Sequence, residues 1–224
     1  KKKFWKNLMK HELILRIISS IILVPLSLFF IIKGSFLFIS FITLCFLIAS
    51  FEWHTMSKKT AYYIPGLLFL FISFLSVYYL RNSFYNNGMI LFLFILIICV
   101  STDIGGYFFG KVFKGPKLTK ISPNKTYSGM IGGYFLSIFS VYILFDLKQK
   151  FDLNYIDKEF DYKVIIFIFL ISTISQIGDI IISYFKRISK IKNTGKIIPG
   201  HGGLLDRIDG MVFSFPSAYV ILLY

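Results

Sequence analysis

The 224-residue chain is more apolar than a soluble globular domain. The residue types AVILMFWYC make up 56% of it and charged residues only 16%, whereas soluble domains carry about 25% charged residues. The same composition argues against intrinsic disorder. The 25 Lys and Arg against 11 Asp and Glu give a net charge of +14. In a membrane protein this excess marks cytoplasmic loops and contact with anionic lipid or phosphate. We therefore expect membrane lipid as a partner, and no nucleic acid.

Seven apolar runs are candidate membrane-spanning helices. The runs are continuously apolar, which favours helices over β-strands. Several are shorter than the ~20 residues that a helix needs to cross the hydrocarbon. The runs are Leu13–Ile32, Ser35–Ser50, Ala61–Leu80, Gly88–Thr102, Gly129–Phe145, Val164–Ile182 and Gly210–Tyr224. We expect an all-α, polytopic integral membrane bundle of about seven transmembrane helices.

The basic side chains predict the orientation of this bundle. With the N-terminus in the cytoplasm, 19 of the 25 Lys and Arg fall in cytoplasmic segments, as the positive-inside rule requires. The two longest basic loops, 103–128 and 183–209, then share the cytoplasmic face. We expect one membrane domain, with N-terminal helices over 1–102 and a catalytic region over 103–224.

Four of the acidic residues lie at the cytoplasmic end of a predicted span or in a basic loop. They are Asp103, Asp179, Asp206 and Asp209. Carboxylates at membrane depth are costly and are interpreted by default as functional. On a helix, Ser175, Asp179 and Ser183 form one polar stripe that Lys186 or Arg187 continues.

A glycine-rich break follows this stripe. Pro199–Gly203 must interrupt the helix and bring backbone N–H groups close to another group. Asp206 and Asp209 then share the face of a new helix. Two carboxylates beside a glycine loop among Lys and Arg suggest a hard cation that holds phosphates, since Mg²⁺ prefers one or two carboxylates, waters and phosphate oxygens. A capping and ion-pair cluster is the structural alternative, but capping alone does not need the glycine loop.

Two further features lie around the fourth and fifth runs. Asp103 ends the fourth run, and the turn Ser122–Thr126 offers hydroxyls and a cation as a shelf for nucleotide or phosphate. Gly105–Lys111 matches the spacing of a P-loop, but Val112 replaces the required Ser or Thr and no strand precedes it. The pairs Gly106/Gly110 and Gly129/Gly133 predict close helix packing.

The region from Gln176 onward resembles the signature of the phosphatidate cytidylyltransferase (CDP-diacylglycerol synthase) family. Asn193 departs from it, because the family usually has Asp there. Segments 103–110 and 122–126 extend the resemblance, which covers roughly the second half of the chain. The matching residues are Ser183, Lys186, Arg187, Lys192, His201, Gly202, Gly203, Asp206, Arg207 and Asp209.

The resemblance implies that CTP and phosphatidic acid react to CDP-diacylglycerol and pyrophosphate at the cytoplasmic face of a bacterial inner (plasma) membrane. It implies one or two Mg²⁺ ions on Asp179, Asp206 and Asp209. The implied phosphate-neutralising and donor groups are Lys186, Arg187, Lys192, His201 and Arg207. The implied substrate-binding residues are Asp103, Ser122, Asn124, Lys125, Thr126, Ser183, Asn193, Gly202 and Gly203. A homodimer is compatible with the sequence.

Two other functions stay open. A CTP- or ATP-dependent polyprenol or phytol kinase could use the same metal and phosphate groups, although the long match argues against it. A membrane transporter predicts acids at the bilayer midplane and internal repeats. The acids of this chain gather at one face, and no repeat is evident.

Overall fold

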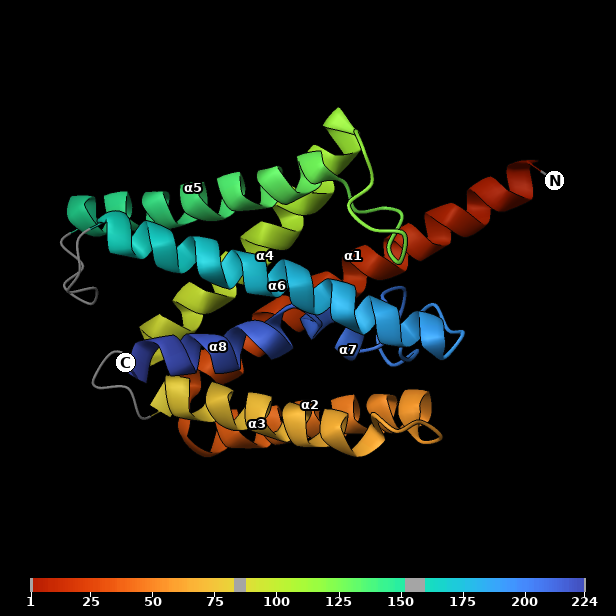
Figure 1. Ribbon diagram of the computed structural model, residues 1–224, viewed down its shortest axis with the longest axis horizontal. Coiled ribbons are helices and arrows are strands. Elements are labelled where there is room, and N and C mark those ends of the chain that lie inside the picture. Colours follow the sequence, from red (N-terminus) through yellow and green to blue (C-terminus); the bar gives the residue numbers. More distant parts are fainter. Residues whose placement is uncertain (1, 83–87, 152–159, 224) are drawn as a thin grey trace. The chain divides into compact units, whose positions relative to one another are not determined.

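The computed structural model describes residues 2–82, 88–151 and 160–223, and the side chains of 14–82, 88–147 and 160–223. These residues form helices and two isolated bridges, without a strand. Six helices are long and apolar enough to cross a membrane, which confirms the all-α membrane fold. The helices are α1 (Lys2–Lys33), α2 (Ser35–Ser57), α3 (Tyr63–Asn82), α4 (Gly88–Phe113), α5 (Tyr127–Phe151), α6 (Tyr162–Ile188), α7 (Leu205–Ile208) and α8 (Met211–Leu223) (Figure 1).

The last predicted span is a short helix. α8 has 13 described residues, or ~20 Å at 1.5 Å per residue, and it reaches the last residue that the structure describes. One helical turn, α7, precedes it. Residue 224, the end of this span as predicted, lies outside the described residues.

The chain divides into two compact units, and the boundary falls inside the predicted catalytic region. The first unit comprises Lys1–Phe71 and Ile188–Ile208, and the second Ile72–Arg187 and Asp209–Tyr224. In the first unit, Gly34 joins α1 to α2 with a φ of 65°, a backbone conformation that favours glycine. Trp53 of α2 donates its indole N–H to the carbonyl of Tyr63 at the start of α3 (3.0 Å).

Glycines bring α4 and α5 of the second unit into backbone contact. A Cβ on Gly129 would lie 2.6 Å from the carbonyl oxygen of Gly106 and 3.4 Å from Cα of Gly110. A Cβ on Gly105 would clash with the carbonyl oxygen of Gly132. Small residues allow such close approach of helices in membranes, and the packing predicted from the Gly-x-x-x-Gly pairs is confirmed. α5 in turn runs beside α6, where Tyr134 stacks on Phe169 (ring centroids 4.5 Å apart) (Figure 1).

Two neighbouring glycines of α4 provide a matched test of this packing. Gly105→Ala places a methyl group against backbone that cannot move aside, at a cost of about 1–3 kcal/mol. Gly106→Ala meets only ordinary van der Waals contact, 3.8 Å from the carbonyl oxygen of Gly129, and gains roughly 0.5–1 kcal/mol of helix propensity. We expect Gly105→Ala to lower the thermal unfolding midpoint in detergent, and Gly106→Ala to leave it unchanged or raise it. Equal midpoints would contradict the packing.

Candidate active site

The polar stripe of α6 forms one wall of the candidate site in the second unit. Ser183 is buried and donates its hydroxyl to Oδ1 of Asp179 (3.4 Å). Lys186 is only 9% exposed, whereas Arg187 is exposed. The sequence left open which of the two bases continues the stripe, and the structure places Lys186 there.

Two glycines bring Asp209 to this stripe. A Cβ on Gly210 would clash with the Ser175 hydroxyl on α6. A Cβ on Gly178 would lie 2.6 Å from the ring of Phe213 and 3.1 Å from the carbonyl oxygen of Asp209. Because neither glycine carries a side chain, the chain entering α8 lies directly against α6.

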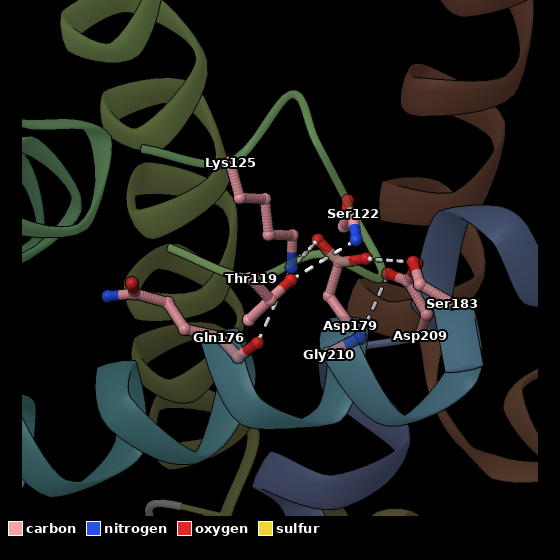
Figure 2. A network of polar contacts seen from close by, with 8 residues as sticks. All are labelled: Thr119, Ser122, Lys125, Gln176, Asp179, Ser183, Asp209 and Gly210. Carbon is pink, nitrogen blue, oxygen red and sulfur yellow. Dashed lines mark hydrogen bonds and ion pairs between the residues drawn. The ribbon is translucent and has the colours of Figure 1, made fainter. Parts of the chain in front are cut away.

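The carboxyl groups of Asp179 and Asp209 consequently face each other. Figure 2 shows them side by side above α6, and Asp179 is close enough to act on the charge of Asp209. Burial raises the pKa of Asp209 well above its ordinary value, because a buried charge loses its hydration. The negative charges of Asp179 and Asp103 raise it further, and Lys186 opposes them. The pair therefore attracts positive charge.

Lys125 reaches this pair from the loop between α4 and α5. Its ammonium group forms an ion pair with Oδ2 of Asp179 and donates to the carbonyl of Gln176 (3.4 Å) (Figure 2). The loop is held closed because Leu118 donates its N–H to the carbonyl of Lys125 (2.8 Å).

The other predicted residues of this loop have different surroundings. The hydroxyl of Thr126 accepts the N–H of Gly129 (3.1 Å) and so caps the start of α5, a structural role. Ser122 donates its N–H to the hydroxyl of Thr119 (3.1 Å), and Asn124 is exposed.

A tight turn carries the predicted histidine in the first unit. Ile198 donates its N–H to the carbonyl of Gly202 (2.9 Å), and Gly202 has a φ of 93°. Two arginines hold the tip of this turn. Arg16 of α1 donates Nε–H to the carbonyl of Gly200 (2.7 Å), and Arg207 of α7 donates from Nη2 to the carbonyl of His201 (2.9 Å).

His201 lies close enough to both arginines for their charges to act on it. Its Nδ1 is 2.8 Å from the hydroxyl of Ser19, and its Nε2 is 3.4 Å from the hydroxyl of Ser20. Partial burial lowers the pKa of His201 below its ordinary value of 6.5, and the charges of Arg207 and Arg16 lower it further. The imidazole is therefore neutral at pH 7, with one ring nitrogen as a donor and the other as an acceptor.

Asp206 orders the backbone around this turn. Its Oδ2 accepts the N–H groups of Thr194 (2.8 Å) and Gly203 (3.1 Å). Lys192 and Asn193, which precede these contacts in the chain, are exposed.

The predicted residues thus fall into two clusters. No group of three His, Cys, Asp or Glu side chains within the described ranges is arranged to hold a metal. Asp179 and Asp209 form a pair in the second unit, and the assignment of Asp206 as a third ligand stays a prediction. The second-unit cluster is Asp103, Lys125, Asp179, Ser183, Lys186 and Asp209, and the first-unit cluster is Lys192, Asn193, His201, Gly202, Gly203, Asp206 and Arg207.

Two residues that contact the loop of the site were not predicted from the sequence. Arg16 holds the turn described above, and Glu52 of α2 binds the same loop with its carboxylate. Glu52 had a recognisable signal, since it follows the predicted run Ser35–Ser50 by two residues and lies between Phe51 and Trp53, and an acid at the end of an apolar span is by default interpreted as functional. Arg16 had none, because a base at a helix end also serves membrane topology.

Comparisons with known proteins agree on one family. The family model described as "Cytidylyltransferase family" matches residues 82–224. The phosphatidate cytidylyltransferase of Rickettsia felis is 36% identical, over 95% of this chain and 93% of that protein. Its counterpart from Rickettsia bellii is also 36% identical, over 96% of this chain and 93% of that protein. The phosphatidate cytidylyltransferase of Staphylococcus aureus is 32% identical, over 82% of this chain and 68% of that protein.

The surroundings of His201 predict its titration. We expect its NMR titration midpoint to lie below 6.5, because burial and two nearby guanidinium groups disfavour the imidazolium form. Arg207→Met removes one of these charges and should raise the midpoint. Lys196→Met removes a base that does not act on His201 and should leave the midpoint unchanged. A wild-type midpoint at or above 6.5 would contradict this arrangement.

Proposed function

Because the chain belongs to the cytidylyltransferase family, we propose that it transfers the cytidylyl group of CTP to phosphatidic acid. The products are CDP-diacylglycerol, for phospholipid synthesis, and pyrophosphate. The observation that carries the proposal is the similarity, over nearly the whole chain, to phosphatidate cytidylyltransferases. The helices that could span a membrane suit a substrate that is itself a membrane lipid.

The reaction needs no covalent enzyme intermediate. An oxygen of the phosphatidic acid phosphate forms a bond to the α-phosphorus of CTP, and the bond from that phosphorus to the pyrophosphate oxygen breaks. The protein contributes by holding two anions together in line and by neutralising their charge. Both contributions call for fixed cationic groups and for fixed hydrogen-bond donors.

We assign Mg²⁺, as one or two ions, to the carboxylates of the site. The facing pair Asp179 and Asp209 fits the preference of Mg²⁺ for one or two carboxylates with waters and phosphate oxygens. Burial first, and then the negative charges of Asp179 and Asp103, raise the pKa of Asp209, and a bound cation would stabilise its ionised form. When bound, Mg²⁺ offsets the charge of the triphosphate. Lys125 holds the Asp179 carboxylate in place through their ion pair. We keep Asp206 as a candidate third ligand.

The basic side chains take the phosphate groups. Lys186 lies close enough to Asp209 to act on its charge, so we assign it to the nucleotide together with the loop 103–128. Arg16 and Arg207 each use one N–H on a backbone carbonyl and form no ion pair with a described carboxylate. We assign these two guanidinium groups to the lipid phosphate, with His201 as a donor beside them.

The excess of Lys and Arg in the predicted cytoplasmic segments supports a site that faces the cytoplasm. The bacterial relatives support the inner (plasma) membrane as its location. A homodimer stays a prediction.

Substitution of the carboxylate pair tests the proposal. We expect Asp179→Asn and Asp209→Asn each to lower pyrophosphate release from CTP, phosphatidic acid and Mg²⁺ by about 10²–10³-fold, because each removes one of the two carboxyl groups that we assign to Mg²⁺. Asp161→Asn is the matched control. Asp161 caps the start of α6 by accepting the N–H of Val164 (3.0 Å), and asparagine caps equally well. Wild-type turnover in either site variant would remove the pair from the mechanism.

The departure at position 193 generates another prediction. Asn193 is exposed, so an added charge there remains hydrated. We expect Asn193→Asp to retain transfer activity within about threefold, because an exposed side chain that changes in charge but not in shape has a small effect. An inactive but folded variant would show that the amide itself contacts substrate.

A further inference from the structure

Glu52 is a buried acid on α2, and it is the only Asp, Glu, Lys or Arg of that helix. It is 2% exposed. Burying a carboxylate in apolar surroundings is costly unless hydrogen bonds compensate for the lost hydration. The partners of Glu52 therefore reveal what the residue is for.

Among the described residues, the hydrogen-bond partners of the Glu52 carboxylate lie far away in the sequence, between α6 and the first turn of α7. Oε1 accepts the N–H of Leu204 (2.8 Å). Oε2 accepts the N–H of Leu205 (2.8 Å) and the hydroxyl of Thr194 (2.8 Å). The N–H groups at a helix start have no partner within the helix, so the carboxylate serves as the cap of α7 across 152 residues of sequence.

Two glycines make room for this carboxylate. A Cβ on Gly195 would lie 2.6 Å from Oε1 of Glu52. A Cβ on Gly203 would clash with the hydroxyl oxygen of Thr194 and would lie 2.5 Å from Oε2 of Glu52. The second glycine of the His-Gly-Gly sequence thus leaves space for an acid from another helix. This explains its absence of a side chain without invoking a ligand.

Thr194 connects Glu52 to Asp206. Its hydroxyl donates to Glu52, and its N–H donates to Oδ2 of Asp206. Gly203 also donates its N–H to Asp206 and packs against Glu52. Two carboxylates therefore fix both ends of the segment 194–203, on which His201 is carried.

We propose that Glu52 is a positioning residue for the transfer reaction. It holds the loop that presents His201, Gly202 and Asp206, and it contacts neither substrate nor metal. The kinetic part of this proposal rests on the proposed function, whereas the structural part does not.

Glu52→Gln tests the positioning role with little change of shape. One of the two oxygens becomes an NH₂ group, which faces an N–H or O–H donor and cannot accept its hydrogen bond. We expect kcat to fall about a hundredfold, the scale of a small misplacement of reacting groups. The KM for CTP should stay within about threefold, because we assign the nucleotide to Lys125, Lys186 and the aspartate pair. Thr55→Ala, at an exposed site one turn away, should leave both constants unchanged.

A double-mutant cycle tests the contact itself and needs no activity. Gly195→Ala should lower the thermal unfolding midpoint by at least about 3 °C, because its methyl group meets Glu52. In a Glu52→Ala background the space is open, and the same change should have almost no effect. If Glu52→Ala does not fold, Glu52→Asp withdraws the carboxylate by one methylene group and replaces it in the cycle.

The outcomes separate this proposal from the proposed function. If the wild-type protein does not transfer the cytidylyl group, the proposed function is overturned. The double-mutant cycle would still test the contact between Gly195 and Glu52. Wild-type kcat in folded Glu52→Gln protein would overturn the positioning role. A purely structural role predicts that Glu52→Gln lowers kcat and the free energy of unfolding together and raises the KM for CTP. That result would also overturn the positioning role. Additive effects of Gly195→Ala and the Glu52 substitution would overturn the contact.

Discussion

A carboxylate at the edge of an apolar helix must be compensated, and the candidate site is built around this constraint. The compensating groups differ from one acid to the next. Glu52 accepts hydrogen bonds from two N–H groups and one hydroxyl, Asp206 accepts two N–H groups, and Asp179 has Lys125. Asp209 faces Asp179, and its pKa is raised. The first two acids fix the backbone, and the facing pair leaves negative charge that a cation can neutralise. The same type of residue thus builds the loop and forms the proposed metal site.

The family signature is divided between the two compact units, since Ser183, Lys186 and Asp209 belong to the second and His201 and Asp206 to the first. Glycines determine the local geometry in both. Gly178 and Gly210 allow Asp209 to lie against α6, and the glycines around Glu52 allow a helix-borne acid to enter the loop. The glycines of the signature therefore serve close packing of functional acids as much as chain flexibility.

Patterns within one segment could be predicted from the sequence, and contacts between distant segments could not. Hydropathy predicted the long helices. Helical spacing predicted the polar stripe of Asp179 and Ser183, and the Gly-x-x-x-Gly pairs predicted close helix packing. Helical spacing could not decide whether Lys186 or Arg187 continues this stripe. The structure decides it, because Lys186 is buried and Arg187 is exposed. Arg16 lies 184 residues from its partner Gly200, so no local pattern announced that contact. The hydroxyl of Thr126 was predicted to contact substrate, but in the structure it caps the start of α5.

The central claim is tested most directly by determining which phosphorus of CTP is transferred to the lipid. Purified protein would be incubated with phosphatidic acid, Mg²⁺ and CTP labelled either at the α- or at the γ-phosphorus. Cytidylyl transfer predicts that only the α-label enters the lipid phase and that the γ-label leaves as pyrophosphate. A lipid phase labelled from the γ-phosphorus, with CDP released, would show a kinase and contradict the account.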